Sequence, residues 1–400
     1  MKKLSVLLAV LVIAGLLITS CAPAATPAPT AAPAKAAEPT KAPEPTKAPV
    51  PTAAPAATKA PEPTKAPEPA KAAEPTKAAE PTKAAPAPTN TPIPPKCEKL
   101  PNVPTVKAGE LGSPEKPIVI GFVPSGESGR ITRAGNSIAE CLNKMTGLTF
   151  KIEVGTSFAA TIEAMGANKA QVGFLNTFSE LLAEQKYGIV PALAVLRKYN
   201  TNDIDPDKAD AGKLTPYYKG QFIANKASGI KTLADLKGKT FCFVDPNSTS
   251  GSIIPRIILK ANGIDPEKDF KAVQNAGSHD NVGIAVYKGD CDAGVSYIDV
   301  LTDAAANLKG KYPDIQDKVI YVSVTDPIPS DGVQYVKDLD PKIQAVITDG
   351  LLAMAADPGG NQVLRLLYTI DGFQKIDPTF YKAFADVLKK AGVDPASLVK

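Results

Sequence analysis

Residues 117–155 read PIVIGFVPSGESGRITRAGNSIAECLNKMTGLTFKIEVG, and this stretch decides the fold class. The apolar run PIVIGFVP at its start predicts a short buried strand, and TFKIEVG at its end predicts a second strand. Between them, the spacing of apolar residues predicts a helix from about Ile131 to Met145. A strand, a helix and a strand in this order form the unit that joins two parallel strands of one sheet.

The same alternation continues along the chain. We predict further strands at 171–176, 191–199, 220–226, 240–244 and 291–298, helices at about 159–168, 179–188, 250–262 and 279–288, and a return segment at 321–336 before a helix-rich end. The sequence therefore predicts an α/β fold with lobe 1 at 97–217, lobe 2 at 218–329 and a return to lobe 1 at 330–400. We expect each lobe to be a mainly parallel sheet flanked by helices, with a ligand cleft between the lobes at the carboxyl ends of the strands.

The first residues of the chain predict export. Two lysines follow Met1, and the apolar run LSVLLAVLVIAGLLI is too short and too close to the terminus for a typical membrane-spanning helix. The run ends in LITSC at residues 17–21, which resembles the lipobox of bacterial lipoproteins. We expect residues 1–21 to be a lipoprotein signal peptide and Cys21 to be lipidated, which anchors the protein to the membrane from outside the cytoplasm. The alternative is an ordinary secretory signal with a chance Cys after the cleavage site.

Residues 22–96 are built from variants of APEPTKAP, and most of the 39 prolines of the chain lie before residue 105. Because this composition cannot bury enough apolar surface to offset its ordering entropy, we predict a disordered tether rich in Pro, Ala, Thr, Lys and Glu. The tether either lets the globular part sample the space around a membrane-bound partner or lifts it through a cell wall. Its Thr residues could carry glycans.

The composition argues against several classes of function. The formal net charge is only +4, and Lys and Glu are interspersed, so we expect no binding to nucleic acid. The chain has one His and no Trp, which removes most metal sites and most His-dependent catalytic mechanisms. We expect no metal, no cofactor and a monomeric protein.

Four Cys remain once Cys21 is assigned to lipidation: Cys97, Cys141, Cys242 and Cys291. Outside the cytoplasm an even set suggests two disulfides, although four Cys allow three connectivities. A bridge from Cys97 to Cys141 would pin the start of the globular part to its first helix. Cys242 and Cys291 both lie at predicted strands, which could be neighbours in the sheet.

The segment DPNSTSGSIIPRIIL at residues 245–259 predicts an anion site. A strand ends before it, and a helix opens at Ser248, Thr249 and Ser250. The start of a helix presents unpaired N–H groups and a positive dipole end, and the hydroxyls add further donors. Ser and Thr are also ordinary helix N-caps, so this segment alone does not establish a site.

Two longer runs contain this segment and resemble a known family. They are SGIKTLADLKGKTFCFVDPNSTSGSIIPRIILKANGID at 228–265 and AGSHDNVGIAVYKGDCDAG at 276–294. Together they are similar to the periplasmic binding proteins for phosphonate, phosphite and phosphate, with weaker similarity over about 115–395. The resemblance implies a two-lobe periplasmic-binding-protein fold of type II. It also implies that Ser248, Thr249, Ser250 and His279 hold the phosphoryl oxygens of the ligand.

The family lines the other side of the cleft with aromatic and acidic groups that meet the substituent on phosphorus. The resemblance places Tyr218 at an aromatic position, and it places Asp299 and Asp331 at acidic positions that neutralise a ligand ammonium. Two positions depart from the family. Phe158 stands where aminoalkylphosphonate binders often carry Tyr, and Asn176 with Thr177 replaces a segment that often contains Gly, although both side chains could donate to an oxyanion.

The resemblance implies a solute-binding protein that captures a small phosphorus oxyanion by lobe closure and delivers it to the permease and ATPase subunits of an ABC importer. No GxxxxGK[ST] loop occurs, so ATP hydrolysis would belong to a partner subunit. One alternative is a tethered sensory receptor of the same fold. A less favoured one is an esterase or phosphatase with Ser248 as nucleophile and His279 as base.

Overall fold

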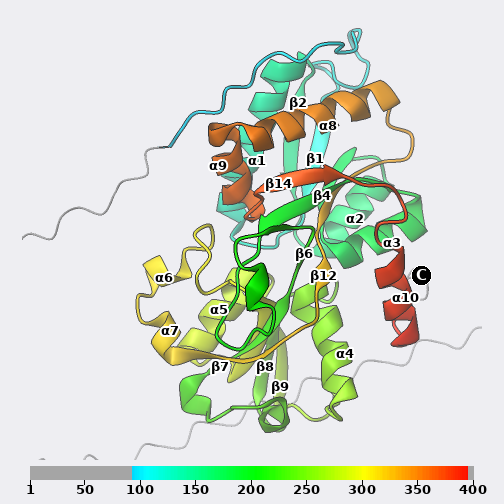
Figure 1. The fold of residues 1–400 in the computed structure, drawn as a ribbon. Coiled ribbons are helices and arrows are strands. Elements are labelled where there is room, and N and C mark those ends of the chain that lie inside the picture. The colour runs from blue at the N-terminus through cyan, green and yellow to red at the C-terminus, as the bar shows by residue number, and fades with distance from the viewer. Residues whose placement is uncertain (1–91, 395–400) are drawn as a thin grey trace, which may run out of the picture. The chain divides into compact units, whose positions relative to one another are not determined.

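The structure, a computed structural model, describes residues 92–394 (Figure 1). The predicted signal peptide, the predicted lipidation site Cys21 and residues 22–91 of the predicted tether lie outside the described residues, as do residues 395–400. Within 92–394, no helix is both long enough and apolar enough to cross a membrane.

Lobe 1 is built on a seven-stranded sheet. Its strands are β1 (Ile118–Phe122), β2 (Phe150–Val154), β3 (Val172–Leu175), β4 (Val190–Lys198), β5 (Leu214–Thr215), β13 (Gly332–Tyr335) and β14 (Gly372–Lys375). The order across the sheet is β14-β4-β13-β3-β1-β2, and β5 pairs with β4. The pairs of β1 with β2 and with β3 are parallel, whereas all pairs of β13, β14 and β5 are antiparallel.

Six helices belong to this part of the chain: α1 (Ser128–Thr146), α2 (Phe158–Gly166), α3 (Thr177–Tyr187), α8 (Pro341–Ala356), α9 (Pro358–Tyr368) and α10 (Lys382–Lys390). Helices α1, α8 and α9 pack together on one face of the sheet, and α2 and α3 cover the other face (Figure 1). The Glu127 carboxylate caps α1 by accepting hydrogen bonds from the N–H groups of Gly129 and Arg130, and α1 ends at Gly147 with φ 68°.

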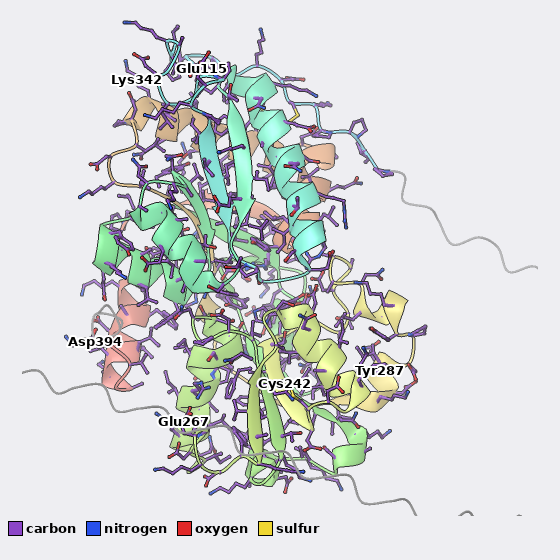
Figure 2. The ribbon with its side chains drawn as sticks, turned by 180° about the vertical axis from the view of Figure 1, so that it is seen from behind. Glu115, Cys242, Glu267, Tyr287, Lys342 and Asp394 are labelled. Atoms are coloured by element: carbon purple, nitrogen blue, oxygen red, sulfur yellow. A yellow bond between two sulfur atoms is a disulfide. The ribbon has the colours of Figure 1, made fainter. Side chains whose placement is uncertain are left out.

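Lobe 2 is built on a five-stranded sheet with the order β11-β7-β10-β8-β9. Its strands are β7 (Gly220–Asn225), β8 (Thr240–Phe243), β9 (Ala272–Asn275), β10 (Ala293–Tyr297) and β11 (Val319–Val324). Strand β8 pairs in parallel with β9 and β10, and β7 pairs antiparallel with β10 and β11. Cys242, labelled in Figure 2, lies on β8, between β10 and the edge strand β9.

The helices of lobe 2 are α4 (Ile254–Ala261), α5 (His279–Lys288), α6 (Leu308–Lys311) and α7 (Ile315–Lys318). A π-helical turn at Thr249–Ile253 precedes α4, so the helix predicted at 250–262 does not begin as an α-helix. The chain passes between the lobes on β6 (Tyr217–Tyr218) and β12 (Ile328–Pro329), which pair antiparallel (Figure 1).

Both sheets are mixed rather than mainly parallel, which corrects the prediction. The reason is the route of the chain between the lobes. Strands β1, β3, β8 and β10 end at the cleft, whereas β7 and β13 arrive from the other lobe and begin at the cleft, so they run in the opposite direction. Strand β14, in the part predicted only as helix-rich, adds a further antiparallel pair.

The folded part begins earlier than predicted. The N–H groups of Ile93 and Lys96 donate to the side chains of Gln362 and Asp357 at α9, with N···O distances of 2.9 and 3.2 Å. Residues 92–96, which the sequence assigns to the disordered tether, are therefore hydrogen-bonded to the globular part. The local composition could not indicate these contacts, because their partners lie more than 260 positions away in the sequence.

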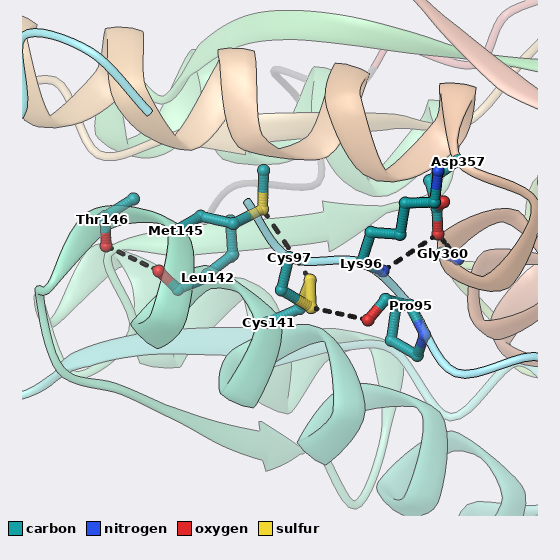
Figure 3. Close-up of a disulfide and its surroundings, with 9 residues drawn as sticks. All are labelled: Pro95, Lys96, Cys97, Cys141, Leu142, Met145, Thr146, Asp357 and Gly360. Atoms are coloured by element: carbon teal, nitrogen blue, oxygen red, sulfur yellow. Dashed lines mark hydrogen bonds between the residues drawn. A yellow bond between two sulfur atoms is a disulfide. The ribbon is translucent and has the colours of Figure 1, made fainter. Parts of the chain in front are cut away.

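Residues 92–394 contain two disulfides, which correspond to one of the three possible connectivities of their four Cys. Cys97 is bonded to Cys141 on α1, with a Cα–Cα distance of 5.1 Å (Figure 3). Cys242 is bonded to Cys291, which precedes the neighbouring strand β10, with a Cα–Cα distance of 5.9 Å. The first bridge holds the start of the globular part against α1, and the second ties β8 to the segment that leads into the neighbouring strand β10.

Candidate ligand-binding site

A cavity of about 70 Å³ lies between the lobes, at the cleft end of strands from both sheets. Val123 and Asn176, which follow β1 and β3, line it from lobe 1. Ser248 and Ile298, which come after β8 and β10, line it from lobe 2. All but one of the predicted site residues line this cavity: Phe158, Asn176, Tyr218, Ser248, Thr249, Ser250, His279, Asp299 and Asp331.

The cradle, which we define as Ser248, Thr249 and Ser250, is formed by the start of the π-helical turn. Ser248 is its N-cap, and the Ser248 hydroxyl accepts a hydrogen bond from the N–H of Gly251 at 3.2 Å. A Cβ atom at Gly251 would lie only 2.7 Å from the Ser248 Oγ, so this position requires Gly. All three cradle residues are buried and line the cavity, and the start of a helical turn leaves N–H groups without partners inside the turn.

His279 is the first residue of α5 and lies next to the cradle. Its Nε2 is 3.4 Å from the Ser248 Oγ, and its Nδ1 is 3.0 Å from the Oγ of Ser296 on β10. Burial, together with the positive charge of Arg197, lowers the pKa of His279 to about 3. The imidazole is therefore neutral at physiological pH, and it can donate from only one of its two nitrogens.

Asn176 connects the two lobes at the cradle. Its Nδ2 donates to the Asn247 carbonyl at 2.9 Å and to the Thr249 Oγ1 at 2.8 Å, and the N–H of Phe178 also donates to Thr249 Oγ1. Thr249 thus serves as an acceptor for lobe 1. The Oδ1 of Asn176 is buried and has no hydrogen-bond partner among the described residues.

Thr177 does not line the cavity, so the structure does not support the predicted ligand contact there. It is the first residue of α3, and its hydroxyl donates to the carbonyl of Pro329 on the crossing strand β12 at 2.6 Å. Its side chain is fully buried against this strand.

The aromatic wall of the cavity comes from both lobes. Phe158, the first residue of α2, is buried and brings no hydroxyl to the cavity. Tyr218 on β6 keeps its hydroxyl within hydrogen-bonding reach of Ser250, and burial and the Asp331 carboxylate raise its pKa. Tyr218 is therefore a neutral donor beside the cradle.

Asp299 and Asp303 lie near each other at another part of the cavity wall. Asp299 accepts a hydrogen bond from Asn200 at 2.5 Å, and Asp303 accepts from Tyr297 at 2.8 Å and Thr369 at 2.9 Å. Burial and the neighbouring Asp303 carboxylate raise the pKa of Asp299 to about 6. Within 92–394 neither carboxylate has an ion-pair partner.

Two arginines line the cavity that the sequence reasoning missed. Arg197 on β4 pairs with Asp331 at 2.8 Å, and its guanidinium lies 5.4 Å from the centroid of the Tyr218 ring. Arg130 on α1 pairs with Asp280 on α5 at 3.1 Å. Asp331, which was predicted to neutralise a ligand ammonium, is therefore already neutralised by Arg197.

A signal for both arginines exists in the sequence. Arg197 follows Leu193 and Val195 at a spacing of two, which places a charge on the same face of the strand as buried residues. Arg130 precedes Ala134 and Ile138 at a spacing of four, on the buried face of α1. Tyr368 and Thr369 also line the cavity, but only long-range packing brings them there, so no local pattern predicts them.

The family described as ABC transporter, phosphonate, periplasmic substrate-binding protein matches residues 120–381, more than half of the chain. The chain belongs to this family. The resemblance inferred from the two motif runs is therefore confirmed. The description of the family places its members in the periplasm, which lies outside the cytoplasm.

Two curated relatives carry related names. The phosphate-import protein PhnD of Mycolicibacterium smegmatis is 28% identical over 53% of this chain, and the chain spans 64% of its length. The phosphonates-binding periplasmic protein of Escherichia coli is 25% identical over 63% of this chain and 70% of its own length.

Solved structures of binding proteins support the fold. A binding protein component of an ABC phosphonate transporter from Pseudomonas aeruginosa has a TM-score of 0.59 and 21% identity, and it covers 69% of this chain and 86% of its own. PhnD1 of Prochlorococcus marinus, solved in complex with methylphosphonate, has a TM-score of 0.58 and 20% identity over 69% of this chain and 98% of its own. The predicted two-lobe periplasmic-binding-protein fold is confirmed, with mixed sheets in both lobes.

Proposed function

We propose that this binding protein captures a small phosphorus oxyanion, of the phosphonate, phosphite or phosphate kind, in the cavity between its lobes. The observation that carries the proposal is the meeting of the cradle and His279 from lobe 2 with Arg197 and the start of α1 from lobe 1 around one small cavity. Helix starts, hydroxyls and guanidinium groups are the donors that bind tetrahedral oxyanions in proteins.

The size of the cavity supports a small ligand. A volume of about 70 Å³ has room for a handful of water-sized groups, which suits phosphate, phosphite or a small phosphonate. The buried Nε of Arg130 and Nη1 of Arg197 have no hydrogen-bond partner among the described residues. Because unpaired buried donors are costly, an oxyanion or ordered water is expected to satisfy them.

The unpaired acids favour a ligand that carries a positive group. Arg197 pairs with Asp331 and Arg130 pairs with Asp280, so in the described part of the chain Asp299 and Asp303 form no ion pair. An ammonium group of an aminoalkylphosphonate would form charge-assisted hydrogen bonds with these carboxylates. The absence of a hydroxyl at Phe158 leaves the rest of the substituent to apolar contact.

The protein is also proposed to deliver its ligand to an ABC importer at the membrane. Family membership supports partnership with the permease and ATPase subunits of an ABC importer, with closure of the two lobes over the ligand. The lipobox-like LITSC at residues 17–21 supports a lipid anchor at Cys21, and the Pro-rich residues 22–91 support a tether outside the cytoplasmic membrane. In a membrane fractionation, Cys21→Ala should move the protein from the membrane to the soluble fraction.

Binding rather than catalysis fits the geometry of the cradle. The side chains of Ser248 and His279 lie next to each other, as the nucleophile and base of a catalytic triad would. The other imidazole nitrogen, however, contacts the Ser296 hydroxyl and not a carboxylate, and Asp280 is paired with Arg130. A carboxylate at this third position would stabilise the imidazolium that forms during attack, and a hydroxyl does so poorly. Incubation with activated phosphate and carboxylate esters should therefore show no turnover.

A thermal-shift panel tests the proposed function. Phosphate, phosphite, methylphosphonate and 2-aminoethylphosphonate are compared with sulfate, which has the same shape and a different central atom. A ligand at 100 times its Kd stabilises the folded protein by about 2.7 kcal/mol. A concentration-dependent rise in Tm with at least one phosphorus oxyanion is expected. No rise, or a rise with sulfate alone, would contradict the proposal.

A further inference from the structure

Ser296 on β10 is fully buried, and its hydroxyl lies 3.0 Å from His279 Nδ1, on the side of the imidazole that faces away from the cradle. The other nitrogen, Nε2, lies 3.4 Å from Ser248 Oγ, and Ser248 lines the cavity. Three polar side chains therefore form one continuous chain of contacts from the sheet of lobe 2 to the cradle.

The hydrogen bonds among Ser296, His279 and Ser248 can be arranged in two ways, because each hydroxyl and the neutral imidazole has one proton to donate. In the first, the Ser296 hydroxyl donates to Nδ1, and the Nε2–H donates to Ser248. In the second, every donor and acceptor is exchanged, so that Nδ1–H donates to Ser296 and the Ser248 hydroxyl donates to Nε2. A neutral imidazole permits both, because it carries one N–H and one lone pair.

The two arrangements present different groups to the cavity. The Ser248 Oγ already accepts a hydrogen bond from the N–H of Gly251. In the first arrangement the Nε2–H of His279 fills the second lone pair of Ser248, so the hydroxyl proton is free to meet the ligand. In the second arrangement that proton is used, and a lone pair faces the ligand. A hydroxyl has one proton and two lone pairs, so no other distribution satisfies both neighbours.

We propose that Ser296 is a positioning residue: it donates to Nδ1, holds His279 in the Nε2–H tautomer in the liganded protein, and so frees the Ser248 proton for an anionic ligand oxygen. This inference rests on the proposed capture of a phosphorus oxyanion. It adds a residue outside the cavity wall to the binding machinery and explains why a buried hydroxyl lies behind the only imidazole of the chain. It also makes the cradle selective for an oxygen without a proton at this position.

The single His makes the tautomer directly measurable. Protein labelled with 15N-histidine, purified with a tag free of His, gives the signals of one imidazole only. The spectrum is recorded free and with saturating phosphate, phosphite, methylphosphonate or 2-aminoethylphosphonate. The Nε2–H tautomer in the liganded protein is expected. The Nδ1–H tautomer or an imidazolium would overturn the role of Ser296 alone, whereas a lack of binding by all four compounds would overturn the proposed function as well.

Affinities of variants give a second readout. Ser296→Ala should weaken binding of the compound used for the spectrum about tenfold, or ~1.4 kcal/mol, and Ser296→Thr, which keeps the hydroxyl, should restore most of the affinity. Ser113→Ala is the matched control, because this buried Ser precedes β1 and lies away from its cleft end. Equal losses of affinity in the Ala and Thr variants of Ser296 would contradict the proposal. If Ser296→Ala fails to fold, the 15N spectrum of the unmodified protein still tests which tautomer His279 adopts.

Discussion

Arg130 of α1 and Asp280 of α5 form an ion pair between the two lobes, with 3.1 Å between Nη2 and Oδ2. Both side chains are buried, and the pair is supported from lobe 1 by the N–H of Glu127, which donates to Asp280 Oδ2 at 3.1 Å. Arg130 also donates to the carbonyls of Leu366 and Leu367. Removing one partner of a buried pair costs about 3–5 kcal/mol, unless the structure opens and lets water reach the other charge.

Opening of the lobes is therefore the expected response to loss of this pair. Asp280→Asn should increase the radius of gyration of the free protein in small-angle X-ray scattering and weaken ligand binding about tenfold. Arg133→Gln is the control, because Arg133 pairs with Glu127 at 3.8 Å in an exposed position, and exposed pairs contribute little. Unchanged scattering and affinity in Asp280→Asn would show that this pair does not hold the lobes together.

The buried His279 should make the protein less stable in acid. Its pKa is about 3 in the folded protein and about 6.5 in an unfolded chain, so between these values only the unfolded state takes up the proton. The free energy of unfolding should therefore fall as the pH decreases, by about 2 kcal/mol between pH 7.5 and 5.0 from this group. Urea unfolding of the unmodified protein and of His279→Asn measures the difference. The same loss of stability in both would contradict a buried neutral imidazole.

Asp299 should control the preference for a ligand ammonium. At pH 7.5, above its raised pKa of about 6, the carboxylate is ionised, and 2-aminoethylphosphonate should bind at least tenfold more tightly than methylphosphonate, or ~1.4 kcal/mol. Below pH 6 the carboxyl is protonated, so the preference should shrink. Asp299→Asn should remove this dependence on pH. Competition calorimetry at the two pH values measures both effects, and equal affinities at pH 7.5 would refute the ammonium site.

The disulfide between Cys97 and Cys141 should stabilise the start of the globular part. It closes a loop with a sequence separation of 44 residues, for which the loss of chain entropy in the unfolded state predicts about 2–4 kcal/mol. Denaturant unfolding of the variant with both residues changed to Ser should show this loss, while ligand affinity stays the same because the bridge lies away from the cavity. A loss of affinity equal to that of Asp280→Asn would contradict the prediction that this bridge does not affect ligand binding.

Much of the fold could be predicted from local patterns. The apolar run before residue 123 and the spacing from Ile131 to Met145 correspond to β1 and α1, because buried strands and amphipathic helices each leave a period in the sequence. The direction of β7 and β13 could not be predicted this way. Direction depends on the route of the chain between the lobes, and an apolar strand has the same pattern in either direction.

The candidate site likewise contains residues that local sequence could predict and residues that only long-range packing brings together. Ser248 and Ser250 could be found because a helix start and hydroxyls are adjacent in the sequence, whereas His279 came from the resemblance to the family. The pairing of Arg197 with Asp331 joins residues 134 positions apart, so it depends on the packing of β4 beside β13. Thr177 shows the opposite case, since a plausible donor at a strand end turned out to serve the carbonyl of Pro329.

The oxyanion site is tested by calorimetric titration of the four phosphorus compounds into the protein and into the double variant Ser250→Ala with His279→Ala. We predict that at least one compound binds the unmodified protein with a micromolar Kd or tighter. The double variant, shown to be folded by circular dichroism, should not bind it. Micromolar affinity retained in the folded double variant would contradict the assignment of the cradle and His279 as the oxyanion site.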